Sequence, residues 1–164
     1  MKKQFACLVL VALSRFAYAD NLPASGPLYA ATLSDLDDKP VALERYKGKP
    51  LVVNFWARWC APCRTEIPEL IKFRAAHKDK IEVLGIGIED KADAVKEFTK
   101  TYNIDYPVFL AKEKGIPLMQ ALGNNIGGLP FTLFIDRNGQ VIEKKVGMIK
   151  KADLDAVAPL LLRN

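Results

Sequence analysis

The sequence predicts an α/β fold with a mixed central sheet that helices cover on both faces. Short apolar runs alternate along the chain with segments of helical periodicity, and two further apolar segments near the end flank an Asn-Gly pair. Alternating strands and helices form a sheet with helices on both sides, whereas Asn-Gly between two strands predicts an antiparallel hairpin. A length of 164 residues fits one domain.

The first residues predict an export signal. Lys2 and Lys3 precede an apolar run over 5–13, and Ala17-Tyr18-Ala19 supplies the small residues that a signal peptidase reads. The run spans nine residues, whereas about 20 are needed to cross a bilayer. We therefore expect a signal peptide over 1–19 and a periplasmic or otherwise extracytoplasmic protein, with an uncleaved N-terminal membrane anchor as the alternative.

Removal of residues 1–19 would change the charge and the cysteine count. It takes away Lys2, Lys3 and Arg15 and leaves 21 basic against 19 acidic residues, a net charge of +2. This balance gives no reason to expect nucleic acid or a membrane surface as a partner. Cys7 would also leave, and the two remaining cysteines are too few for a disulfide scaffold.

The first half of the expected domain contains a hairpin and a buried strand. Residues 20–28 are rich in Pro, Ser and Gly and predict a flexible lead-in, which places the domain at 29–164. Residues 29–43 alternate around Asp37-Asp38-Lys39, which indicates a small hairpin. The nearly continuous apolar run from 51 to 56 is typical of a strand that is buried on both faces.

The later elements follow from the same two periodicities. Apolar residues at helical spacing predict helices over 62–77, around Val95 to Tyr102, over about 116–122, and at the C-terminus, where Pro159 should bend or shorten the helix. Short apolar runs predict strands over 81–88, 107–110, 131–135 and 141–146.

Two cysteines lie where the buried strand gives way to a helix, in the segment Trp59-Cys60-Ala61-Pro62-Cys63. The nucleophile toward disulfides is a thiolate, and a helix N-terminus can lower a cysteine pKa from about 8.5 into the range of about 3.5–7.5. Pro62 falls in the first turn, where its missing N–H costs little. We therefore predict thiol–disulfide exchange with Cys60 as the attacking thiol, Cys63 as the buried resolving thiol, and no cofactor beyond their disulfide.

Two other roles for the cysteine pair are less favoured. A structural zinc site takes four ligands, and outside the signal the chain offers no further cysteine and only His77, so we expect no metal. A purely structural disulfide between neighbours on one helical turn would close too small a loop to stabilise the fold much.

The segment LVVNFWARWCAPCR (51–64) resembles the active site of thioredoxins and, more closely, of the exported TlpA/ResA-like reductases. Pro68 in the following helix and the Gly128-Leu129-Pro130 segment before FTLFID match the same family, and the resemblance extends over about 28–162. It implies a thioredoxin-like three-layer α/β/α sandwich with a mixed central sheet, an N-terminal β-hairpin and a central helix–strand insertion in 88–125.

The resemblance also implies roles for residues around the cysteines. Pro130 would be cis and face the pair, the backbone of Leu129 would dock an extended substrate segment, and Trp59 and Pro62 would complete the substrate-binding surface. Glu66 lies nearly one turn after Cys63 and would act as a proton relay with a raised pKa. The alternative is an exposed glutamate that complements the helix dipole.

The implied function is reduction of disulfides in exported proteins, with apocytochromes awaiting haem or copper-delivery proteins as partners and a membrane electron donor that restores the dithiol. We expect a monomer. A disulfide oxidase or isomerase remains the main alternative. The redox potentials of thioredoxin and DsbA differ by the equivalent of about 7 kcal/mol, and the Ala61-Pro62 dipeptide does not fix where the potential of this pair lies between them. A non-catalytic Cu(I)-binding or chaperone module also stays open, although no Met–His cluster accompanies the thiols. A peroxidase is less favoured, because the second cysteine lies too close to the first.

Overall fold

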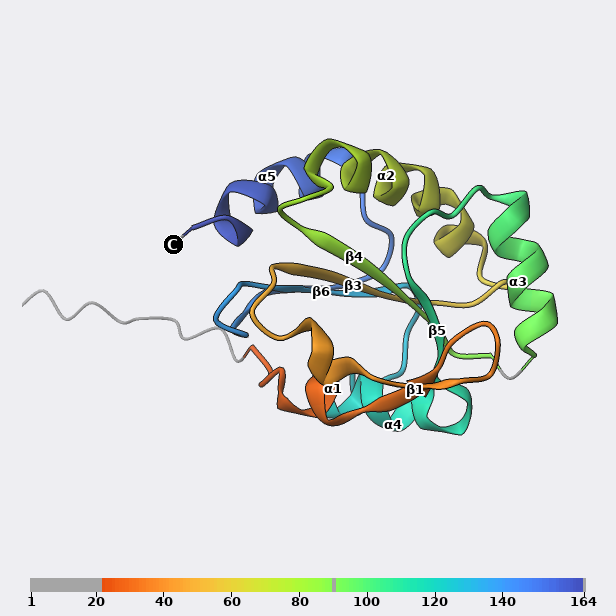
Figure 1. The fold of residues 1–164 in the computed structure, drawn as a ribbon. Helices are drawn as coiled ribbons and strands as arrows, with labels where there is room; N and C mark the ends of the chain where they lie inside the picture. Colours follow the sequence, from red (N-terminus) through yellow and green to blue (C-terminus); the bar gives the residue numbers. More distant parts are fainter. Residues whose placement is uncertain (1–21, 90, 164) are drawn as a thin grey trace, which may run out of the picture.

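The computed structural model describes residues 22–89 and 91–163, which fold around one seven-stranded mixed sheet (Figure 1). The strand order is β2-β1-β5-β4-β3-β6-β7, with β3 parallel to β4 and antiparallel to β6. The strands are β1 (Thr32–Ser34), β2 (Pro40–Ala42), β3 (Leu51–Trp56), β4 (Glu82–Gly87), β5 (Val108–Leu110), β6 (Phe131–Ile135) and β7 (Val141–Val146). The expected signal peptide over 1–19 lies outside the described residues.

Helices cover both faces of the sheet, which confirms the three-layer prediction. One face packs against α2 (Ala61–His77), α3 (Ala92–Thr101) and α5 (Lys151–Leu161). The other face packs against α1 (Gly26–Ala30), α4 (Gly115–Ala121) and the 3₁₀ turn Leu43–Tyr46. Figure 1 shows α2 and α5 on one side of the sheet and α1 and α4 on the other.

Strand β3 runs through the centre of the sheet and is buried over its whole length, as its apolar run predicts. Successive side chains of a strand point to opposite faces. Val52 and Trp56 accordingly belong to the cluster that contains α2, whereas Val53 and Phe55 belong to the cluster that contains α4. Asn54 follows the period of Val52 and Trp56, so its polar side chain lies on the side of α2.

The predicted hairpins and insertion are present. Strands β1 and β2 pair antiparallel with Leu33 opposite Val41, and β6 pairs antiparallel with β7 across the Asn138-Gly139 turn. Within 88–125, α3 leads into β5, which lies parallel to β4 and antiparallel to β1 and so joins the N-terminal hairpin to the sheet.

One expectation about chain segments needs correction. Residues 26–30 form helix α1, and Leu28 is fully buried, so the folded part begins earlier than position 29. The cause is the apolar cluster on the α4 face, which takes in Leu28 and Tyr29. Pro159 lies inside α5, two residues before the helix ends at Leu161, and its side chain is exposed. None of the helices in the described residues is long and apolar enough to span a bilayer.

Candidate active site

The cysteines lie at the junction between β3 and α2. Strand β3 ends at Trp56, and the Cys60 N–H donates to the Ala57 carbonyl at 3.1 Å, which closes a short turn. Cys60 is the N-cap of α2, and its carbonyl accepts the first helical hydrogen bond, from the Arg64 N–H at 3.2 Å. The apolar strand fixes where the turn begins, and Pro62 in the first helical turn fixes where the helix starts.

Cys60 and Cys63 form a disulfide with an S–S distance of 2.01 Å and a Cα–Cα distance of 5.3 Å. The Cys63 N–H donates to Cys60 Sγ at 3.3 Å, as expected for a sulfur that caps a helix. Cys63 has no exposed surface, whereas Cys60 is 5% exposed. Cys60 is therefore the sulfur of the pair that a partner can approach from outside.

The peptide bond between Leu129 and Pro130 is cis, as the resemblance implies. Pro130 directly precedes β6, whose first residue, Phe131, pairs with Phe55 next to the end of β3. This register puts Pro130 beside the turn that carries Cys60. Leu129 is partly buried and packs against the cluster that includes both cysteines. The structure thus brings the cis-proline segment and the disulfide to one end of the sheet.

Two further predicted substrate-binding residues lie on the surface at the same junction. Trp59 is 68% exposed, which is unusual for so large an apolar side chain. Pro62 is exposed on the first turn of α2. Both flank Cys60 in the chain, so an approaching partner meets an apolar rim around the cysteine.

Glu66 is buried, with 1% of its surface exposed, although it carries a carboxyl group. Its Oε1 accepts a hydrogen bond from Asn54 Nδ2 at 2.7 Å, and its Oε2 accepts one from the Ile149 N–H at 2.7 Å. The alternative of an exposed glutamate at the helix start is therefore wrong. The carboxyl group lies on the buried face of α2, one turn after Cys63.

Burial raises the pKa of Glu66 from its ordinary 4.5 to about 7, because the charged form loses its hydration. The hydrogen bonds from Ile149 and Asn54 and the positive charge of Lys145 act in the opposite direction, but they do not offset the burial. At neutral pH the carboxyl group is thus divided between its two protonation states. Such a group can both accept and return a proton.

Asn54 links the central strand to this carboxyl group. Besides its bond to Glu66, Nδ2 donates to Thr132 Oγ1 at 2.9 Å, and all three side chains are buried. The local sequence pattern predicts no part in the site for Asn54, Thr132 or Ile149. The available signal was the position of Asn54 in an apolar strand, because a buried amide nearly always has hydrogen-bond partners.

Charged side chains hold the outer side of the cysteine turn. Arg58 Nε lies 2.8 Å from Glu89 Oε2, and Arg64 Nη1 donates to the Arg58 carbonyl at 3.3 Å. These contacts tie the turn to the segment that follows β4 and to the first turn of α2. Among residues 22–89 and 91–163, no three His, Cys, Asp or Glu side chains gather as they would around a metal ion.

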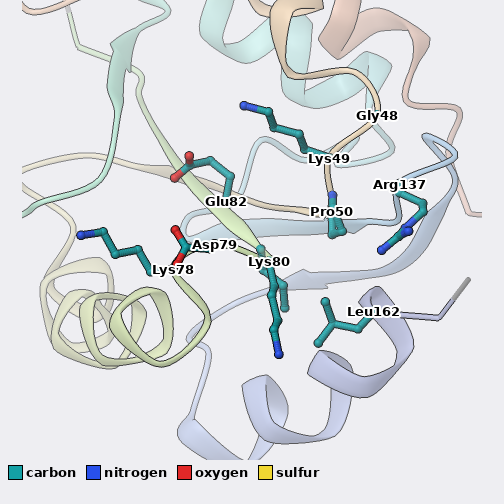
Figure 2. A pocket seen from close by; sticks show the side chains of 10 residues that line it. Gly48, Lys49, Pro50, Lys78, Asp79, Lys80, Glu82, Arg137 and Leu162 are labelled. Carbon is teal, nitrogen blue, oxygen red and sulfur yellow. The ribbon is translucent and has the colours of Figure 1, made fainter.

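A surface hollow of about 760 Å³ lies at the opposite end of the sheet from the disulfide. It is lined by the residues just before β3, by the turn between α2 and β4, by Arg137 and by Leu162 (Figure 2). The lining contains Lys49, Lys80 and Arg137 but no cysteine. The hollow therefore has no part in the reaction of the disulfide.

The chain matches the family model described as Redoxin over residues 20–158. It is similar to the thiol-disulfide oxidoreductase ResA of Bacillus cereus, with 34% identity over 124 residues that cover 75% of this chain and 69% of that protein. It is also similar to ResA of Geobacillus thermodenitrificans, with 27% identity over 161 residues, 94% of this chain and 90% of the relative.

A solved structure shows the same architecture. The crystal structure of a thiol:disulfide interchange protein of the thioredoxin family from Chlorobium tepidum superposes with a TM-score of 0.71 and 32% sequence identity. The match covers 81% of this chain and 93% of the other. The mixed sheet with helices on both faces is thus thioredoxin-like, as the resemblance implies.

Proposed function

Because the chain belongs to the Redoxin family and is a TlpA/ResA-like thiol–disulfide oxidoreductase of the thioredoxin superfamily, we propose that it works in the reducing direction. In this proposal the Cys60/Cys63 dithiol donates two electrons to a disulfide of a partner protein. The sulfur that reacts first is Cys60, which is the more exposed of the two and caps α2.

The reaction proceeds in two exchanges. The Cys60 thiolate attacks one sulfur of the partner disulfide, forms a mixed disulfide with it and releases the other partner sulfur as a thiolate. Cys63 then loses its proton, and its thiolate attacks Cys60 Sγ. The Cys60–Cys63 disulfide forms, the second partner sulfur leaves as a thiolate, and the two partner thiolates take up protons.

Glu66 is the proposed base for the second exchange. Cys63 has no exposed surface, so bulk water does not reach its thiol easily. Glu66 lies one helical turn further along the same buried face and, with a pKa of about 7, is partly ionised at neutral pH. Transfer of the Cys63 proton to this carboxylate would generate the attacking thiolate inside the protein.

The reducing direction rests on one observation at Cys60. A single hydrogen bond, from the Cys63 N–H, reaches Cys60 Sγ within the described part of the chain. Pro62 has no N–H to add a second donor from the first turn. A Cys60 thiolate with as few donors as this disulfide sulfur would leave the reduced form less stable relative to the disulfide, whereas strongly oxidising proteins such as DsbA stabilise their reduced form.

The proposed partners are disulfide-bearing proteins outside the cytoplasm, with apocytochromes and copper-delivery proteins as the classes that the family resemblance suggests. The proposal includes export of this chain, action as a monomer, and a membrane electron donor that restores the dithiol. The predicted signal peptide and the similarity to ResA proteins are its support.

Equilibration of the purified protein with glutathione or dithiothreitol buffers tests the direction. A reductase requires a potential below about −200 mV, nearer to thioredoxin at about −270 mV than to DsbA at about −120 mV. The Cys60→Ser variant should have no disulfide exchange activity. A potential near that of DsbA would replace the proposal by an oxidase, the alternative that the sequence left open.

A further inference from the structure

Helix α4 ends in a way that fixes the position of Asn124. Gly123 adopts a positive φ of 85°, and its N–H donates to the Gln120 carbonyl at 3.0 Å. The Asn124 N–H donates to the Met119 carbonyl at 2.9 Å. These two bonds make up the Schellman motif, which needs a residue in the left-handed region and therefore favours glycine. The backbone of Asn124 is thus held rigidly at the end of the helix.

The side chain of Asn124 is 1% exposed and binds one residue twice. Its Nδ2 donates to the Gly128 carbonyl at 2.8 Å, and its Oδ1 accepts from the Gly128 N–H at 3.2 Å. The Gly127 N–H also donates to the Asn124 carbonyl at 3.1 Å, which closes the turn between them. Both backbone polar groups of Gly128 are therefore held by a single buried amide.

Gly128 directly precedes Leu129 and the cis Pro130. The segment is held on its other side by the Gly147 N–H, which donates to the Pro130 carbonyl at 2.8 Å. Between these two anchors lies the backbone of Leu129, the edge that the family resemblance implies as the docking site of an extended partner segment. Because the Asn124 amide fixes the Gly128 carbonyl and N–H, it also sets the direction in which the N–H and C=O groups of Leu129 point.

We propose that Asn124 is a positioning residue that orients the Leu129 edge for partner proteins through its paired hydrogen bonds to Gly128. The inference rests on the proposed function, because it assumes that a protein disulfide docks along this edge. Asn124 does not touch the cysteines, so it acts on the binding of a partner and not on the chemistry of the sulfurs. Small disulfides, which need no docking edge, should be reduced independently of it.

The test compares Asn124→Ala with Asn125→Ala, a neighbouring exposed asparagine with no side-chain hydrogen bond in the structure. Insulin serves as the protein disulfide and dithiodipyridine as the small one. For Asn124→Ala we expect KM for insulin to rise about tenfold, the size expected when a pair of hydrogen bonds is lost, with kcat unchanged. Dithiodipyridine reduction and the redox potential should equal those of the parent protein. The Asn125→Ala protein should equal the parent protein in all of these measurements.

A second variant keeps the test decisive if Asn124→Ala fails to fold. Asn124→Asp introduces a carboxylate that can accept from the Gly128 N–H but cannot donate to its carbonyl. Protonation restores a donor and an acceptor in nearly the same geometry as the amide. The ratio of its KM for insulin to that of the parent protein should therefore fall toward one as the pH is lowered from about 8 to about 5.

Two results would overturn the inference. The first is a folded Asn124→Ala protein whose KM for insulin equals that of Asn125→Ala. The second is an equal loss of insulin and dithiodipyridine reduction, since that would place the effect on the cysteines or on the fold as a whole. Failure of the proposed function is a separate outcome, because it would show as a redox potential near that of DsbA in the parent protein itself, whatever the Asn124 variants do.

Discussion

Asn54 donates a 2.7 Å hydrogen bond to the carboxyl group of Glu66 in the interior of the protein. The bond joins the strand that leads to Cys60 with the helix that carries Cys63. A buried carboxyl group costs free energy unless it has hydrogen-bond partners. Here Asn54 and the Ile149 N–H supply one partner for each oxygen, so the fold holds a proton acceptor near its resolving cysteine without a buried unpaired charge.

Replacement of Glu66 by Gln should slow the second exchange by about 100-fold, the lower end of typical general-base effects. Glutamine keeps the size of the side chain but cannot take the Cys63 proton. The rate at which a mixed disulfide on Cys60 resolves, followed by stopped flow against pH, checks this. The parent protein should show an inflection near pH 7 that the variant lacks. An identical rate profile for both proteins would exclude Glu66 as the base.

The same carboxyl group should make stability depend on pH. Burial raises its pKa from 4.5 to about 7 in the folded protein, so between these values the folded state keeps a proton that the unfolded state has lost. The free energy of unfolding must therefore decrease as the pH rises through this window. The full contribution is about 3 kcal/mol.

Denaturant unfolding of the parent protein and Glu66→Gln from about pH 4 to about pH 8 measures this dependence. The stability of the parent relative to the variant should decline by about 3 kcal/mol across that range and stay constant above it. A constant difference at every pH would show that Glu66 titrates normally.

Asn54 should hold the pKa of Glu66 down, because its hydrogen bond favours the ionised carboxylate. Asn54→Ala is expected to raise that pKa further and to cost about 1–3 kcal/mol of stability. Thr132→Val is the matched control, because Thr132 bonds Asn54 but not Glu66. The titration midpoint of the Glu66 carboxyl carbon, followed by NMR, should therefore rise in Asn54→Ala and stay unchanged in Thr132→Val. Equal shifts in both variants would assign the effect to general repacking.

Ile126 is 85% exposed on the turn that Asn124 organises, close to Gly128 and to the exposed Val146. Burial of this exposed isoleucine against a partner would stabilise the complex by about 25 cal/mol per Å² of apolar surface removed from water. We expect Ile126→Ser to raise KM for insulin several-fold with stability unchanged within about 0.5 kcal/mol. Ile126→Leu should restore the parent value. Equal KM values for the Ser and Leu variants would exclude this contact.

Much of the fold could be predicted from local patterns. The apolar run of β3 and the Asn-Gly turn before β7 each depend on residues that are near one another in the chain, and both elements occur where predicted. The position of the cysteine pair at the start of a helix could also be predicted, because the strand, the turn and the helix start follow one another directly in the chain. The cis form of Pro130 came from resemblance, since an X-Pro bond carries little local signal.

The parts that were missed depend on contacts between distant segments. Glu66 was expected as a relay with a raised pKa, but its partner Ile149 is 83 positions away, so no local pattern shows which backbone group bonds the carboxyl group. The burial of Leu28 depends in the same way on α4, which lies far along the chain. The link between Asn124 and Gly128 is short, but it requires the end of α4 and the turn at Gly127 to be known first.

Mass spectrometry of trapped partner adducts tests the central claim most directly, namely that Cys60 attacks and Cys63 resolves. Reduced Cys63→Ser protein, mixed with insulin, should accumulate a mixed disulfide at Cys60, whereas Cys60→Ser protein should form none under the same conditions. An adduct that forms on Cys63 in the Cys60→Ser protein at a comparable rate would contradict the account.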